Sequence, residues 1–197
     1  MVVVLNPGHT PETKGKRSPD GKLREYKWAR ETARLASDKL TEAGIANIIA
    51  CADKEQDSLS LPVKMANRLC VQCGVSNVLF VSIHCNAAGN GKEWTSARGW
   101  EIWTSVGKTR ADELATCIYA AAKRIFAGHK LRTDTTDGDP DKEKDYYVLK
   151  ATHCPAVLIE NFFMDNREDC AFLLTDESKQ KAAQVILEGV KAYISKK

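Results

Sequence analysis

Short apolar runs alternate along the chain with longer segments in which apolar residues recur every three or four positions. The runs are rich in β-branched residues and predict buried strands, which lie at 2–5, 45–50, 78–83, 100–104, 146–149 and 156–159. The longer segments predict amphipathic helices, which lie at 25–43, 58–73, 109–126 and 178–195. Gly44 and Gly74 end the first two helices, and Asp57 or Ser58 caps the second.

Strands that alternate with helices predict an α/β fold with a twisted, mostly parallel sheet that carries helices on both faces. The chain has 197 residues, which suits one hydrophobic core. No repeat, low-complexity segment or linker interrupts the pattern. We therefore expect a single domain over residues 1–197.

Four polar residues stand at comparable places in this pattern. His9 follows the first strand after a sharp turn, and His84 follows the central strand. Glu25 opens the first helix, and Glu160 ends the last long strand. Because open α/β sheets bind ligands at the carboxyl ends of their strands, these residues are expected to converge. Polar loops should wall a groove there, and they lie at 10–23, 88–99 and 128–144.

Two histidines and a carboxylate are a common ligand set for catalytic zinc, and a second carboxylate can take a proton from water. Each residue also has a simpler explanation. A lone histidine more often packs or lies in a loop, and Glu25 is favoured in a first helical turn by the helix dipole. Glu160 is harder to dismiss, because a carboxylate after the apolar run AVLI is costly unless it is paired.

Charge and cysteine content restrict the binding partners and the cellular compartment that we expect. The net charge of +3 gives no reason to expect nucleic acid binding, and no segment is long enough to span a membrane. The N-terminus lacks the features of a signal peptide. The seven cysteines are scattered, apart from Cys70 and Cys73, which is typical of free thiols. We expect synthesis in a cytoplasm without a signal peptide.

The whole chain resembles the catalytic domain of the zinc-dependent N-acetylmuramoyl-L-alanine amidases of type 3. NPGH at 6–9 is similar to that family's opening Asp-Pro-Gly-His. Ala66-Asn67 followed by LFVSIHCNA is similar to its AN…LFISIHANA signature, and PAVLIENFFMDNRED at 155–169 is similar to its PAVLVE-GFLSN-ED motif. The order and spacing of these motifs agree over nearly the full length.

The resemblance implies a role for each of the four residues. His9, Glu25 and His84 would hold one Zn²⁺ per chain, and Glu160 would be the catalytic carboxylate. The substrate would be peptidoglycan, cut between N-acetylmuramic acid and L-alanine. Without an export signal, a phage endolysin that reaches the cell wall after release fits better than a secreted autolysin. The oligomeric state stays open.

The chain departs from the family at two places. Asn6 stands where the family has Asp, so a histidine oriented by this side chain would lose a negative charge, and metal affinity or activity would change by about 10–100-fold. The polar stretch 133–145 has no family counterpart and is a candidate for substrate selection.

Two other functions stay open. One is a zinc hydrolase of the same fold that cuts another peptide or an N-acyl amino acid, and the other is a non-catalytic wall-binding domain. Among the remaining residues, Cys70 and Cys73 are expected to face the core. Strand alternation should turn Cys85 away from the site. The indole rings could stack on sugars or pack in the core, and they belong to Trp94, Trp100 and Trp103.

Overall fold

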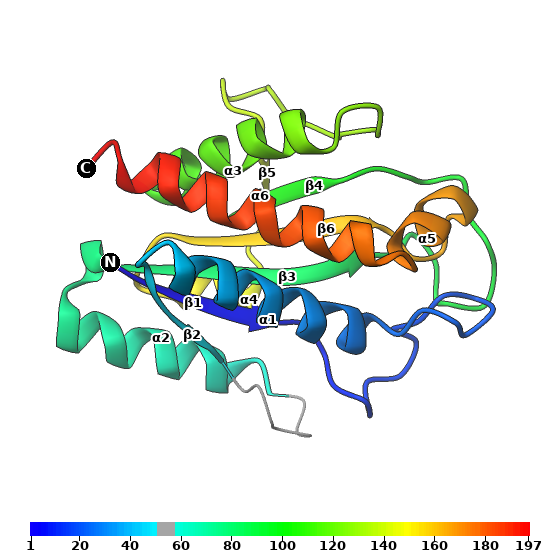
Figure 1. Cartoon of the computed structure of the whole chain (residues 1–197), viewed down its shortest axis with the longest axis horizontal. Helices are drawn as coiled ribbons and strands as arrows, with labels where there is room; N and C mark the ends of the chain where they lie inside the picture. The colour runs from blue at the N-terminus through cyan, green and yellow to red at the C-terminus, as the bar shows by residue number, and fades with distance from the viewer. Residues whose placement is uncertain (51–57) are drawn as a thin grey trace.

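A computed structural model describes residues 1–50 and 58–197, which form a six-stranded sheet with helices on both faces (Figure 1). The strands are β1 Val2–Pro7, β2 Ala46–Ile49, β3 Val78–Asn86, β4 Glu101–Thr104, β5 Lys142–Glu143 and β6 Ala156–Phe163. The helices are α1 Glu25–Glu42, α2 Ser60–Cys73, α3 Ala111–Ile125, α4 Tyr147–Lys150, α5 Arg167–Leu173 and α6 Asp176–Ile194, with a 3₁₀ turn at Val75–Asn77.

The strand order is β2-β1-β3-β6-β4-β5. The first four strands in this order run parallel, and β4 lies antiparallel to β6. The chain passes from β1 to β2 on one side of β1, whereas β3 lies on the other side of β1. The strand order therefore reverses between β1 and β3. This is the place where open α/β sheets bind ligands.

Two apolar clusters cover the two faces of the sheet. Helices α1, α3 and α6 pack on one face, where Leu79, Val81 and Ile83 of β3 are buried. Helices α2 and α4 pack on the other face against Phe80 and Leu158. Strand alternation assigns successive residues of β3 to opposite faces, so the residues that follow Phe80 in steps of two point to the α2 and α4 side.

The structure confirms the α/β class and the four long helices. Helix α1 begins at Glu25, as predicted, and ends before Gly44, whose φ of 72° suits glycine at this position. Thr175 caps α6 by accepting a hydrogen bond from the backbone N–H of Ser178. The start of α2 differs slightly, because Ser58 accepts from the N–H of Leu61 and the helix begins at Ser60; Asp57 lies outside the described residues.

The strand predicted at 146–149 is wrong, because Tyr147–Lys150 forms the short helix α4. Its aromatic and β-branched residues favour a strand, but four residues are too few for a period to be read. The segment instead buries Val148 and Leu149 against α2 and the sheet. Cys73 is also exposed rather than in the core, whereas Cys70 is buried as expected.

Strand β5, helix α5 and the 3₁₀ turn at Val75–Asn77 were absent from the sequence prediction. Strand β5 lies inside the predicted loop 128–144 and is only two residues long. Helix α5 begins after Asn166, whose side chain accepts hydrogen bonds from the backbone N–H groups of Glu168 and Asp169. An Asn followed by two acidic residues is a typical helix start, so this helix could have been found from the sequence.

Candidate metal centre and its pocket

The two histidines reach the same place from β1 and β3. His9 lies just after β1 in a left-handed backbone conformation with φ 61°, which is uncommon for a residue other than glycine. The preceding residue must be glycine, because a Cβ atom on Gly8 would lie 2.2 Å from Cε1 of His84. The two imidazole rings stand edge to face, with centroids 5.1 Å apart.

Glu25 joins the two histidines through one oxygen. Its Oε1 lies 3.0 Å from Nδ1 of His84 and 3.5 Å from Nε2 of His9. The same oxygen accepts the backbone N–H of Cys85 at 3.2 Å. The Glu25 side chain is 1% exposed, and its Oε2 is buried without a hydrogen-bond partner in the described part of the chain. Burying a carboxylate oxygen without a partner costs free energy, so a ligand bound to Glu25 Oε2 would stabilise the site.

A hydrogen-bonded chain supports His84 from behind. Nε2 of His84 lies 3.1 Å from Oγ of Ser82, and Ser82 accepts a hydrogen bond from Nδ2 of Asn6 at 2.9 Å. Asn6 therefore influences His84 through Ser82, because its side chain donates a hydrogen bond to the Ser82 hydroxyl group. Asn6 is also the residue that stands where the amidases that the chain resembles have Asp. This difference would therefore change how firmly the ring of His84 is held.

The period of β3 decides which side chains face the site. Ser82, His84 and Asn86 point to the same side, whereas Ile83 and Cys85 are buried in the opposite cluster. The burial of the Cys85 side chain in this cluster agrees with the prediction that it turns away, although Cys85 also contributes to the pocket lining. Burial also raises the pKa of its thiol well above the usual value, so Cys85 does not present a thiolate.

Glu160 lies beside His84 on the next strand, because the register of β3 and β6 pairs these two residues directly. Both residues lie inside their strands, which continue to Asn86 and Phe163, so the predictions that His84 follows its strand and that Glu160 ends its strand are both wrong. Glu160 Oε2 is buried and has no hydrogen-bond partner among residues 1–50 and 58–197. Burial, helped by the negative charge of Glu25, raises the pKa of Glu160 to about 8.

Glu101 on β4 is the strand neighbour of Glu160 on the side away from His84. It is 2% exposed and pairs with Glu160 across the antiparallel strands. Unlike Glu160, it has cations, because Arg132 lies at 2.6 Å and Lys142 at 2.9 Å. Asn86 also donates to Glu101, at 2.7 Å. These contacts compensate the charge of Glu101, whereas Glu160 has no ion-pair partner among the described residues.

The donor set suits a metal ion. Ligand atoms of His9, Glu25 and His84 all lie within 4.8 Å of one another, and among the described residues this is the one such group of histidine, cysteine or acidic side chains. Burial alone would raise the pKa of Glu25, but the hydrogen bond and charge of His84 hold it below its usual value. Two imidazoles and an ionised carboxylate at a site with room for a fourth ligand are the pattern of catalytic zinc.

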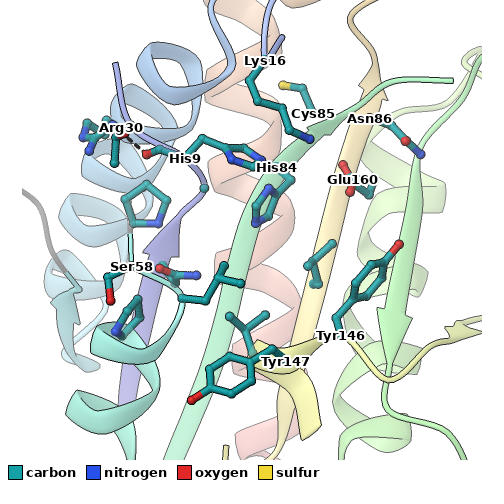
Figure 2. Close-up of a pocket in the computed structure, with 18 of the residues that line it drawn as sticks. His9, Lys16, Arg30, Ser58, His84, Cys85, Asn86, Tyr146, Tyr147 and Glu160 are labelled. Atoms are coloured by element: carbon teal, nitrogen blue, oxygen red, sulfur yellow. Dashed lines mark hydrogen bonds between the residues drawn. The ribbon is translucent and has the colours of Figure 1, made fainter. Parts of the chain in front are cut away.

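A pocket of about 340 Å³ opens over these residues (Figure 2). His9, His84 and Glu160 line its floor. The predicted loop 10–23 contributes Thr10 and Lys16 to the wall. The predicted loops 88–99 and 128–144 contribute no described wall residue, because the other side is formed by residues 58–62 before and within α2 and by residues 146–148.

The sequence profile of the N-acetylmuramoyl-L-alanine amidases matches residues 3–192. This chain belongs to that family. An endolysin of Bacillus phage SPP1 is 33% identical over 120 residues, which are 60% of this chain and 41% of that protein. The amidase LytC of Bacillus subtilis is 26% identical over 98% of this chain and 35% of its own length. The chain thus spans about two fifths and one third of these two relatives.

Solved structures of amidases show the same fold. The N-acetylmuramoyl-L-alanine amidase of Clostridium difficile 630 superposes with a TM-score of 0.84 at 25% identity, over 100% of this chain and 97% of that one. The catalytic domain of CwlV from Paenibacillus polymyxa gives 0.82 at 22% identity, over 100% and 99%. No helix among the described residues of this amidase-family chain has the length and hydropathy of a membrane span.

The structure brings together all four residues that the sequence singled out in this family member. It adds pocket residues that the sequence reasoning missed, among them Lys16, Asn86 and Tyr146. Asn86 could have been found, because it follows His84 at a spacing of two on the same strand. Lys16 and Tyr146 lie in irregular segments, where no period indicates the direction of a side chain.

Proposed function

We propose that this chain hydrolyses the amide bond between N-acetylmuramic acid and L-alanine in peptidoglycan. In this proposal His9, Glu25 and His84 hold one zinc ion, and Glu160 is the catalytic carboxylate. The observation that carries the proposal is the position of Glu160, which lies beside His84 in one pocket with the three clustered ligand atoms. Membership of the amidase family supports the choice of bond.

The residues divide the chemistry as follows. Zinc, when bound by this triad, polarises the amide carbonyl and makes water more acidic. The positive charge of a bound zinc ion would lower the raised pKa of Glu160, and the ionised carboxylate would then accept a proton from the attacking water and deliver it to the nitrogen of the departing L-alanine. Its unpartnered oxygen is available for both transfers. Ser82 fixes the ring of His84, and the backbone N–H of Cys85 fixes Glu25, so neither side chain has to reorganise during the reaction.

A finer proposal is that the chain is encoded by a phage or a related mobile element and lyses the cell wall of the host. The similarity to the endolysin of phage SPP1 supports it. Three variants of the purified protein test the enzymatic part. Glu160→Gln should lower the release of new L-alanine amino termini from isolated cell walls by about 10²–10⁴-fold. It should leave the zinc content unchanged, at about one per chain. His84→Ala should lose both activity and zinc.

The exposed Glu42 at the end of α1 offers a matched control, because Glu42→Gln removes the same charge far from the pocket. Cell-wall hydrolysis that persists in Glu160→Gln would refute the role of Glu160. Release of termini from free peptides but never from cell walls would favour a hydrolase of another amide. Binding to cell walls without any release of termini would favour a non-catalytic domain.

A further inference from the structure

Among the described residues, the lysine and arginine side chains that line the pocket are those of Lys16 and Arg30, and they differ in their contacts. Arg30 is engaged within the protein, where its Nη1 donates to the backbone carbonyl of His9 at 3.1 Å. Lys16 is half-buried, yet its ammonium group forms no hydrogen bond or ion pair with any residue in the described ranges 1–50 and 58–197. A half-buried ammonium group has lost part of its hydration and gains from an anionic partner.

The backbone of Lys16 is held in place, although it belongs to a polar loop. Its carbonyl oxygen accepts the N–H of Glu25 at 3.1 Å, and Arg17 and Arg24 form a β-bridge next to it. On the outer side the loop lies against Gly91, where a Cβ atom would be 2.8 Å from the carbonyl oxygen of Gly15. The start of the Lys16 side chain is therefore fixed relative to Glu25.

The ammonium group of Lys16 lies near the candidate metal centre but does not contact its acids. Its charge lowers the pKa of both Glu25 and Glu160, as a smaller influence than the groups nearer to them, and it forms no ion pair with either. Figure 2 shows Lys16 reaching from the upper wall toward the space above His84 and Glu160. A cation that lines the same pocket as His84 and Glu160 is suited to an anionic group of the substrate near the amide bond whose hydrolysis Glu160 would assist.

Peptidoglycan carries an anion at that step. In the stem peptide, L-alanine is followed by D-glutamate that is joined through its γ-carboxyl group, which leaves the α-carboxylate free. Some cell walls carry this group as a neutral carboxamide instead. We propose that Lys16 binds this α-carboxylate and makes the enzyme prefer the acidic stem over the amidated one. The proposal rests on the function proposed above and adds a specificity to it.

A charge-assisted hydrogen bond in a partly desolvated pocket should change kcat/KM by roughly 10–100-fold between the two forms. The probes are two synthetic N-acetylmuramoyl tripeptides that differ only in this group, one with the α-carboxylate and one with the carboxamide. The wild-type chain should favour the acid by at least tenfold. In Lys16→Met this ratio should fall to about one, and Lys16→Arg should restore most of it.

Lys14 provides the matched control, because it is an exposed lysine of the same loop and lies outside the pocket. Lys14→Met should keep the wild-type ratio. Equal use of both tripeptides by the wild-type chain would overturn the proposal, as would an equal loss for both in Lys16→Met, which would indicate a general electrostatic role. If the zinc-loaded chain hydrolyses neither tripeptide nor cell walls, the proposed function itself fails and the specificity fails with it.

Discussion

Replacing Gly8 by alanine is the sharpest test of how closely the candidate metal centre is built. The new Cβ atom would lie 2.2, 2.3 and 2.8 Å from three atoms of the His84 ring, whereas ordinary contacts begin at 3.4 Å. The ring must therefore move by about 1 Å. The φ angle of Gly8 is not positive, so the backbone itself accepts alanine and the effect comes from the collision alone.

Such a displacement should separate His84 from the other ligands. Its Nδ1 lies 3.0 Å from Oε1 of Glu25, and a zinc–nitrogen bond tolerates little deviation from about 2.0–2.1 Å. A misplacement of about 1 Å in a reacting group can lower a rate about 10²-fold, and crowding of this kind costs about 1–3 kcal/mol of stability. We expect Gly8→Ala to bind zinc about 10–100-fold more weakly than the wild-type chain.

Competition with a chromogenic chelator measures the zinc affinity, and thermal unfolding of the zinc-free protein measures the stability. Gly89→Ala is the control, because its φ is not positive either and its Cβ would make ordinary contacts of 3.4 and 3.5 Å. It should keep the wild-type affinity. If folded Gly8→Ala binds zinc within about threefold of wild type, His84 is not held as described and the reasoning is refuted.

Three further substitutions test other parts of the fold. Asn6→Asp should raise zinc affinity by about 10–100-fold, measured with the same chelator, because it adds a negative charge behind the candidate ligand. Burial and the nearby Asp139 raise the pKa of Asp141 from 3.8 to about 8. The folded chain then holds a proton that the unfolded chain has released, so the free energy of unfolding falls as pH rises from 4 to 8, and Asp141→Asn should flatten this dependence. Gly189→Ala places a Cβ atom 2.5 Å from Ile118 and should lower the stability by about 1–3 kcal/mol in urea titrations.

Each of these expectations has a contrary outcome. An Asn6→Asp protein with weaker zinc binding would mean that the buried charge disturbs the site more than it helps the metal. Asp137→Asn removes an exposed charge from the same loop as Asp141 and should leave the pH dependence as it is. If Asp141→Asn also leaves it unchanged, Asp141 does not hold the proton. Unaltered stability in Gly189→Ala would show that α3 and α6 separate without cost.

The sequence was sufficient for the fold class and for the four residues of the candidate centre, and the reason is geometric. In a parallel sheet, residues near the carboxyl ends of neighbouring strands must lie close together, so His9, His84 and Glu160 could be grouped before any coordinate was known. Glu25 followed from the start of a strongly amphipathic helix. Position along the strand was less certain, because the polar residues that end an apolar run still form strand hydrogen bonds in β3 and β6.

The pocket walls could not be predicted in the same way. Tyr146 and the short helix α4 depend on contacts with α2, which lies far away in the sequence, and local propensity pointed to a strand. The direction of Lys16 depends on a backbone hydrogen bond to Glu25 and on the close approach of Gly91. Such contacts between irregular segments have no period, so a pattern of apolar positions does not contain them.

The alternation along β3 has a consequence for how such a chain can change over evolution or by design. The two sides of the strand serve different purposes. One side supplies Ser82 and His84 to the candidate site, and the other buries Ile83 and Cys85 in the core. Deleting or inserting a single residue between Val78 and Ser82 would exchange the two sides of the strand. It would place an imidazole in the core and an aliphatic side chain over the ligands. Length variation in this family member should therefore be excluded from the strand and confined to the connections that follow it.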